Sequence, residues 1–380
     1  MADEFLWRRP VLKFGTSTLT GGTSQLSLAK MADLVEQVSA LQIAGLQPIV
    51  VSSGAVAAGR QRLGMAAGRK DVSLKQVLAA VGQSRLMHLY DQFFEFHGIT
   101  SAQVLVTRQD LAERQRYLNA RRTLLGLCER RVVPIVNEND VVASDELKLG
   151  DNDTLSALVA NLVDADLLVL VSDIPGLYTA DPLLNPSADL VREVAVITPL
   201  VEAYAGAARS ALGTGGMATK LAAAKLATAS GAEVRIVDGH ERDVILRVLR
   251  GEELGTRFLP RTDPVEGRKR WILSGLNHAG RLVVDPGAAR ALLDRGASLL
   301  PAGVRSVHGV FERGDSVDIA TQAGAIVARG IANYPSEDVS TIHGHQSSAI
   351  EAMLGYSYGN HVVHRDDLVC FGAQERVLNA

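Results

Sequence analysis

Two lysines in the sequence are placed where they could neutralise an anionic group. Lys13 lies in an otherwise apolar run, VLKFG at residues 11–15, and the Thr-Ser pair that follows adds donors in a tight turn. A lysine in such a run is costly to bury unless its ammonium reaches a partner. Lys220 closes the octamer GTGGMATK at residues 213–220. Read alone, each motif also fits a surface lysine; together they indicate a site for phosphate or carboxylate oxygens.

The octamer matches neither of two common phosphate-binding motifs. The pattern G-x-x-x-x-G-K-[ST] fails because three residues separate Gly216 from Lys220 and Leu221 follows. The pattern G-x-G-x-x-G fails because Gly213 and Gly215 are followed directly by Gly216. What remains is a glycine-rich turn at the positive end of a predicted helix, with a lysine about one turn further on.

Acidic side chains are dense in the stretch NENDVVASDELKLGDNDTLSA, residues 137–157. Carboxylates this close repel one another and need cations, a metal or water. An N-cap at the start of a helix explains only one of the acids between 151 and 153. A cationic amino group or the two lysines would balance the acids that the N-cap leaves unexplained. The full set is Glu138, Asp140, Asp145, Glu146, Asp151 and Asp153.

A further polar stretch, SDIPGLYTADP at residues 172–182, follows an apolar run. An ordinary turn accounts for its Pro-Gly pair. Asp173 and Tyr178 would also suit an adenine or ribose pocket. Two lysines, a glycine-rich helix start and acids at strand ends together favour phosphoryl transfer, which asks a protein mainly for positioning and charge neutralisation.

These residues must be positioned by elements that alternate along the first 250 residues. Short, β-branched apolar runs predict buried strands, and amphipathic segments between them predict helices. This alternation is typical of an α/β fold with a mostly parallel sheet sandwiched by helices. Ligands bind such sheets beyond the carboxyl ends of the strands, where the polar residues lie. The predicted strands span 11–15, 48–54, 101–106, 132–140, 166–173 and 233–239, and the predicted helices 28–44, 73–97, 114–130, 151–163, 215–230 and 242–250.

The pattern changes after GTRFLP (255–260). Short segments separated by Gly or Asp, with one helix near 286–296, predict a small β-rich module. We therefore divide the chain into a catalytic domain (1–265), a linker (266–277), a small domain (278–358) and a C-terminal extension (359–380).

Composition narrows the class of protein. A net charge of −3 gives no general attraction to nucleic acid or to an anionic membrane surface. Two distant cysteines, Cys128 and Cys370, fit reduced thiols. The start MADEFLWRRP is unlike a signal peptide, and no apolar run approaches the ~20 residues of a membrane span. We expect a cytoplasmic protein.

Several longer stretches form a recognisable set: VLKFGTSTLTGG, VVSSGAVAAGR, AAVGQSRLM, PIVNENDVVA, KLGDNDTLSALVA, SDIPGLYTADP, GTGGMATKLAAAKLA and GTRFLP. Together they resemble the amino-acid-kinase family, and most specifically its glutamate 5-kinases, which phosphorylate the γ-carboxylate of glutamate at the start of proline biosynthesis. RKRWIL, GASLLPAGV, GVFERGD and MLGYSYG resemble the PUA domain of many bacterial members. The resemblance covers essentially the whole chain.

The resemblance implies a role for each matching residue. Lys13 and Lys220 would neutralise the transferring phosphoryl group, and Asp153 would hold both lysines. Glutamate would be bound by Ser53, Gly54, Asp140 and Asn152, with Asp140 facing its α-ammonium. ATP would be bound by Lys13, Ser172, Asp173, Thr214, Gly215, Gly216, Met217, Ala218, Thr219 and Lys220. Mg²⁺ would bridge the ATP phosphates mainly through water and phosphate oxygens, without dedicated protein ligands.

The resemblance also implies partners and leaves alternatives. It implies proline as a feedback inhibitor, a homo-oligomer, and hand-over of the product to glutamate-5-semialdehyde dehydrogenase. A sister kinase acting on aspartate, N-acetylglutamate or a nucleotide remains an alternative, as does RNA binding through the PUA domain. RNA binding is disfavoured because residues 261–380 carry 12 Lys and Arg against 13 Asp and Glu. The pairs His343/His345 and His361/His364 could suggest a metal site, but no cysteines accompany them at zinc spacing.

Overall fold

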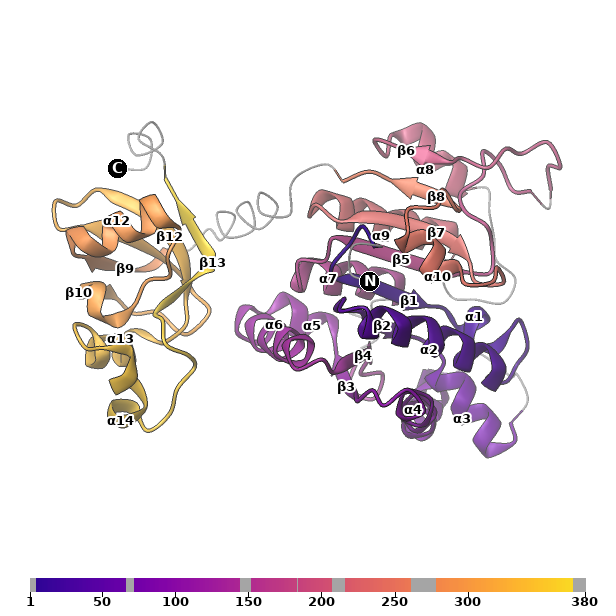
Figure 1. Cartoon of the computed structure of the whole chain (residues 1–380), viewed down its shortest axis with the longest axis horizontal. Coiled ribbons are helices and arrows are strands. Elements are labelled where there is room, and N and C mark those ends of the chain that lie inside the picture. The colour runs from indigo at the N-terminus through magenta and orange to yellow at the C-terminus, as the bar shows by residue number, and fades with distance from the viewer. Residues whose placement is uncertain are drawn as a thin grey trace. The chain divides into compact units, whose positions relative to one another are not determined.

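The computed structural model describes residues 5–65, 72–143, 152–182, 184–206, 216–260 and 278–371. The chain forms two compact units, residues 1–264 and 265–380. The predicted linker, 266–277, lies outside the described residues. Figure 1 shows a large α/β unit and a smaller β-rich unit.

The large unit is built on an eight-stranded sheet in the order β3-β4-β2-β1-β5-β7-β8-β6. The first six strands of that order run parallel, whereas β8 is antiparallel to β7 and parallel to β6. All six predicted strands are confirmed; the short strands β8 and β6, the last two of the sheet order, were not predicted. The strands are β1 (Pro10–Phe14), β2 (Ile49–Ser52), β3 (Ser101–Val106), β4 (Val133–Glu138), β5 (Leu167–Ser172), β6 (Glu193–Val194), β7 (Glu233–Asp238) and β8 (Thr256–Phe258).

Helices cover both faces of this sheet. The six predicted helices are confirmed as α2 (Leu28–Ile43), α4 (Val72–Glu95), α6 (Arg114–Glu129), α7 (Asn152–Leu162), α9 (Met217–Ala229) and α10 (Val244–Leu249). Among the described residues of this unit, four further helices were not predicted: α1 (Thr16–Thr20), α3 (Ala55–Leu63), α5 (Arg108–Ala112) and α8 (Pro199–Gly206). Helices α6, α7 and α9 pack on one face, and α2, α4 and α10 on the other.

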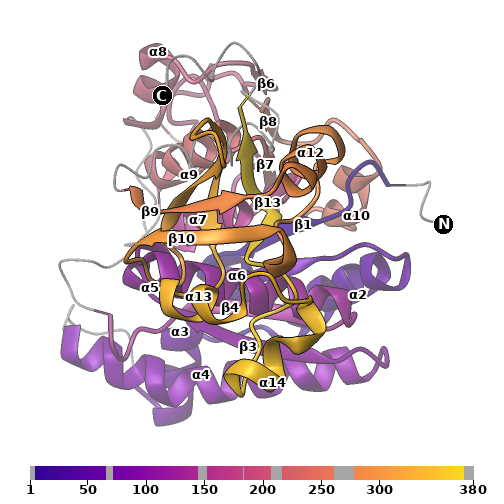
Figure 2. The same ribbon diagram turned by 90° about the vertical axis from the view of Figure 1, so that its left-hand side faces the viewer.

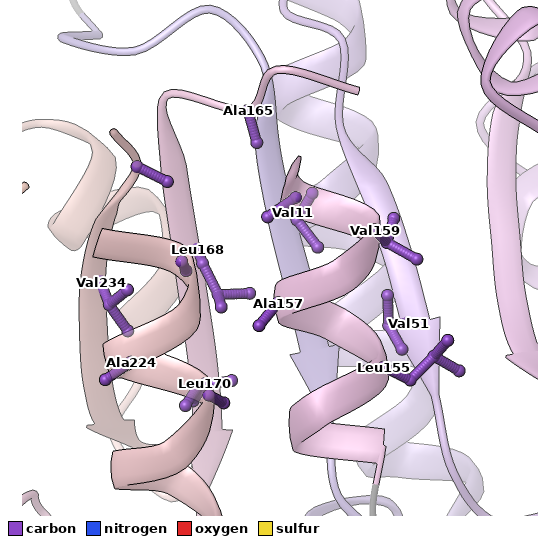
Figure 3. Packing of buried hydrophobic residues seen from close by; sticks show 14 of the residues in the cluster. Val11, Val51, Leu155, Ala157, Val159, Ala165, Leu168, Leu170, Ala224 and Val234 are labelled. Carbon is purple, nitrogen blue, oxygen red and sulfur yellow. The ribbon is translucent and has the colours of Figure 1, made fainter. Parts of the chain in front are cut away.

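Helix α7 is the central helix of the first face. Leu155, Ala157 and Val159 are fully buried against the β1 and β2 side chains Val11 and Val51, as Figure 3 shows. Burying a side chain such as leucine or valine stabilises the fold by roughly 1.5–3 kcal/mol. This packing fixes the N-terminus of α7 at the carboxyl edge of the sheet.

Helices α3 and α4 pack unusually closely on the other face. A Cβ added at Gly82 of α4 would lie 1.8 Å from the carbonyl oxygen of Ala55, and one at Gly59 of α3 would lie 1.9 Å from that of Leu78. Only glycine permits this approach. The contact joins α4 to the turn after β2, where predicted substrate-binding residues lie.

The small unit contains a five-stranded sheet in the order β10-β9-β11-β12-β13; Figure 2 labels β9, β10 and β13 of this sheet. Its strands are β9 (His278–Val284), β10 (Val304–Gly309), β11 (Ser316–Thr321), β12 (Ile326–Ala332) and β13 (Val363–Cys370). Helices α12 (Pro286–Arg295), α13 (Ser336–Ile342) and α14 (Ile350–Leu354) accompany it. The predicted helix near 286–296 is confirmed as α12.

Strand β13 corrects the expectation of a separate C-terminal extension from residue 359. It pairs antiparallel with β12 from Ala328↔Cys370 to Ala332↔Val363. Val362, Val363 and Phe371 are buried. The polar run HRDD (364–367) disguises the strand in the sequence, because this part of an edge strand faces solvent.

Candidate active site

The site is built where parallel strands β1, β2, β4 and β5 end. Strands β1, β2 and β5 are in register near these ends, with Phe14 opposite Ser52 and Val171. Three helices begin beyond these strands or beside them with a glycine N-cap: Gly15 for α1, Gly54 for α3 and Gly216 for α9. None of the three caps makes a side-chain hydrogen bond, so first-turn N–H groups remain suited to an anionic ligand.

Asp153, in the first turn of α7, pairs with both predicted lysines. Its Oδ1 lies 2.5 Å from Lys13 Nζ and its Oδ2 3.3 Å from Lys220 Nζ. Lys13 and Lys220 are only 4% and 7% exposed, and Asp153 is fully buried. Buried charges persist only when paired and hydrogen-bonded, so the carboxylate fixes two ammonium groups in one place.

The elements explain why these three side chains meet. Lys13 is the penultimate residue of central strand β1, and Lys220 lies in the first turn of α9. Thr219 places its hydroxyl 2.9 Å from Asp153 Oδ2 and 2.8 Å from the Gly216 carbonyl. Among the described residues, the site thus places two ammonium groups around one carboxylate, an arrangement that can meet a phosphate.

A second cluster gathers around the Asn152 amide. Its Nδ2 lies 2.8 Å from the Ser52 carbonyl, 3.0 Å from Ser53 Oγ and 3.0 Å from Asn137 Oδ1. Asn137 in turn donates its Nδ2 to Gln83 Oε1 of α4 at 2.8 Å. This network ties β2, β4, α4 and α7 together beside the lysines.

Gly54 requires the conformation that only glycine adopts easily. Its φ is +100°, and an added Cβ would lie 3.2 Å from Leu19 Cδ1 and 3.3 Å from Leu26 Cδ2. The turn therefore presents Ser53 and the start of α3 in one fixed arrangement.

Tyr90 of α4 forms a hydrogen bond with Ser52, the residue just before this turn. Its hydroxyl lies 2.8 Å from Ser52 Oγ, which donates to the Ser53 carbonyl at 2.9 Å. Tyr90 is fully buried, and burial raises the pKa of its hydroxyl far above the ordinary value. The phenol therefore stays neutral and keeps its proton for hydrogen bonding.

Asp140 lies in the turn after β4 and pairs with Lys75 of α4, with 3.7 Å between Oδ1 and Nζ.

On the other side of β1, Ser172 ends β5 and donates to Asp173 Oδ1 at 3.2 Å. Ser172 is buried, whereas Asp173 is exposed. Solvent can therefore reach this end of the site.

The structure brings Lys13, Asp153 and Lys220 together, and Ser53 with Asn152. Met217 is buried in α9 and Ala218 exposed. Thr214 and Gly215 lie outside the described residues, as do the acids Asp145, Glu146 and Asp151. The sequence analysis assigned no role to Ser52, Gln83, Tyr90 or Asn137; of these, Ser52 and Asn137 carried a signal, as polar residues at strand ends.

Two buried lysines paired with one carboxylate at the carboxyl edge of a mostly parallel sheet are the arrangement expected of an α/β enzyme that handles phosphate, and comparisons specify the class. Residues 8–238 match the amino acid kinase family, and residues 280–354 match the PUA domain. The chain is 52% identical to glutamate 5-kinase of Herpetosiphon aurantiacus, over 97% of this chain and all of the relative. It is 51% identical to glutamate 5-kinase of Dehalococcoides mccartyi (97% and 99% covered) and of Deinococcus radiodurans (95% and 99% covered).

The chain therefore belongs to the amino acid kinase family and, within it, to the glutamate 5-kinases with a C-terminal PUA domain. Membership of a kinase family makes ATP the co-substrate. Within the described residues, no three His, Cys, Asp or Glu side chains gather to hold a metal ion. No helix of the described chain is both long and apolar enough to cross a membrane.

Proposed function

We propose that this protein transfers the γ-phosphoryl group of ATP to the γ-carboxylate of L-glutamate, giving L-glutamyl 5-phosphate for proline biosynthesis. The observation that carries the proposal is the pairing of Asp153 with Lys13 and Lys220 at the carboxyl edge of the sheet. The names of relatives near 50% identity over nearly the full chain support the choice of glutamate.

In the reaction, a γ-carboxylate oxygen of glutamate attacks the γ-phosphorus as the bond to the β,γ-bridging oxygen breaks, and ADP leaves. Lys13 and Lys220 offset the negative charge on the phosphoryl oxygens, and Asp153 keeps both ammonium groups in place. Fixed charges are most effective in such a buried site because they need no rearrangement during the reaction.

The substrates fit on opposite sides of the lysines. Ser53, Gly54 and Asn152 bind glutamate beside β2, and Asp140 faces its ammonium. The exposed end of β5, with Ser172 and Asp173, and the start of α9, with Gly216, Met217, Ala218 and Thr219, bind ATP together with the unplaced Thr214 and Gly215. The described residues offer no cluster of metal ligands. Mg²⁺ would enter as part of MgATP and would help to neutralise the charge on its phosphates.

Further proposals follow from membership of the group. Proline acts as feedback inhibitor, the protein forms a homo-oligomer, and the unstable product passes to glutamate-5-semialdehyde dehydrogenase. Use of ATP and glutamate for biosynthesis suits the cytoplasm. These proposals await inhibition, sizing and transfer assays.

Trapping with hydroxylamine tests the substrate. Purified protein with MgATP, glutamate and hydroxylamine should accumulate γ-glutamyl hydroxamate, and little product should form from aspartate or N-acetylglutamate. N-acetylglutamate lacks the ammonium that Asp140 would bind. A strong signal from aspartate with none from glutamate would reassign the enzyme to a sister kinase.

A further inference from the structure

The ion pair between Lys75 and Asp140 joins α4 to the turn after β4. Lys75 Nζ lies 3.7 Å from Asp140 Oδ1, and the two side chains are 41% and 13% exposed. The neighbouring Gln76 donates to the Ala143 carbonyl at 3.5 Å, and Gln83 binds Asn137 two turns further along α4. The N-terminal half of α4 therefore runs alongside residues 137–143, the segment that carries two of the polar side chains at the candidate glutamate site.

We propose that Lys75 binds the α-carboxylate of glutamate and so, with Asp140, recognises the zwitterionic end of the substrate. The inference rests on the proposed function, in which Asp140 takes the α-ammonium. That ammonium and the α-carboxylate are both bonded to the α-carbon of glutamate. A cation within 3.7 Å of the group that binds the first is therefore within reach of the second.

The charges of the ion pair and of the amino-acid end of glutamate are complementary. Asp140 and Lys75 form one negative and one positive group, and the amino-acid end of glutamate presents the opposite pair. In the structure, Lys75 stands where a substrate ammonium would go, so binding exchanges one ion pair for two. The exchange is easy because a partly exposed ion pair 3.7 Å apart contributes little to stability. The four-carbon stem of lysine allows its head to move.

This arrangement predicts which analogues the site rejects. Glutarate keeps both carboxylates but lacks the ammonium, so it leaves the Asp140 charge unmatched. 4-Aminobutyrate keeps the ammonium and the reacting carboxylate but lacks the α-carboxylate, so it leaves Lys75 without its new partner. Removing Lys75 should therefore weaken the binding of glutamate and leave the binding of 4-aminobutyrate almost unchanged.

The test compares Lys75→Met and Lys75→Arg with the unmodified protein. The matched control is Lys225→Met, because Lys225 makes another exposed ion pair, 2.7 Å from Glu202 Oε1. For each protein, kcat and the KM values for glutamate and ATP are measured by hydroxamate formation. The inhibition constants of 4-aminobutyrate and glutarate against glutamate are measured in the same assay.

Loss of a charged hydrogen bond should raise the KM for glutamate about 10- to 100-fold in Lys75→Met. We expect kcat, the KM for ATP and the inhibition constant of 4-aminobutyrate to change less than about threefold. Lys75→Arg should recover much of the affinity, and Lys225→Met should behave as the unmodified protein. An unchanged KM for glutamate in Lys75→Met would overturn the proposal, as would equal losses for glutamate and 4-aminobutyrate. Either result leaves the proposed function standing as long as the unmodified protein makes γ-glutamyl hydroxamate.

Discussion

Lys13 at the end of β1 and Asp153 at the start of α7 form an ion pair of 2.5 Å between side chains that are almost wholly buried. The pair lies near the middle of the sheet, between the two sides proposed to bind glutamate and ATP. Lys220 reaches the same carboxylate from α9. One carboxylate thus organises two cations from different parts of the chain.

The lysine from α9 can be tested without disturbing the fold. Lys220→Met keeps the aliphatic stem and removes the charge. We expect kcat to fall about 10²- to 10³-fold, because the ammonium acts on charge in the transition state, while the KM for glutamate changes little. Steady-state kinetics and a circular dichroism spectrum check this. A kcat near that of the unmodified protein would show that Lys220 takes no part in the chemistry.

Neutralising the shared carboxylate should cost both stability and activity. Asp153→Asn leaves two buried ammonium groups without their counter-ion, so we expect a loss of about 3–5 kcal/mol in the free energy of unfolding. The control is Asp318→Asn, which breaks the buried pair with Arg329, 2.9 Å apart in the small unit. Calorimetry should show destabilisation in both variants, with lost turnover only in Asp153→Asn. An active Asp153→Asn protein would contradict the role given to the carboxylate.

Tyr90 should position the turn after β2, which is proposed to bind glutamate, through its hydrogen bond with Ser52. Tyr90→Phe removes the hydroxyl that lies 2.8 Å from Ser52 Oγ. We expect a loss of about 1 kcal/mol in stability and a several-fold rise in the KM for glutamate, with kcat nearly unchanged. Tyr334→Phe is matched, since that buried tyrosine donates its hydroxyl to Gly359 at 2.6 Å in the small unit. Tyr334→Phe should lower stability without changing the KM for glutamate. A raised KM in both variants would mean that the effect of Tyr90→Phe is not specific to the turn after β2.

Cys128 should give the protein a measurable pH dependence. Burial raises the pKa of its thiol from 9.0 to about 11. Between these values the unfolded chain releases the proton while the folded protein keeps it, so stability must fall as pH rises. The loss attributable to this thiol should reach about 2–3 kcal/mol by pH 11. Urea unfolding of Cys128→Ala across pH 8–10.5 should show a shallower decline; parallel curves for the two proteins would contradict the assignment.

Much of the fold of the large unit could be predicted because its strands and helices leave local patterns in the sequence. Buried parallel strands are continuous apolar runs, and Lys13 stands out because it interrupts one. Asp153 and Lys220 mark helix starts, and parallel topology brings strand ends and helix starts to one edge. Family resemblance then linked the three residues before any distance was known.

The features that could not be predicted from the sequence depend on contacts between residues far apart in the chain. Helix α3 is short and glycine-containing, and the close approach of Gly59 and Gly82 stabilises its packing on α4. Gln83 and Tyr90 look like ordinary residues of a long amphipathic helix; their polar atoms gain meaning only where α4 meets Asn137 and Ser52. Strand β13 has polar residues along its exposed part, so its pairing with β12 leaves little trace in the sequence.

The most direct test of the central claim follows the oxygen atom that forms the new bond. Glutamate labelled with ¹⁸O in its γ-carboxylate is incubated with the protein, MgATP and hydroxylamine, and the released phosphate is analysed by mass spectrometry. Attack by the γ-carboxylate on the γ-phosphorus predicts phosphate carrying one ¹⁸O atom, in step with γ-glutamyl hydroxamate. Phosphate released without the label would mean that ATP is hydrolysed by water, which would contradict phosphoryl transfer to glutamate.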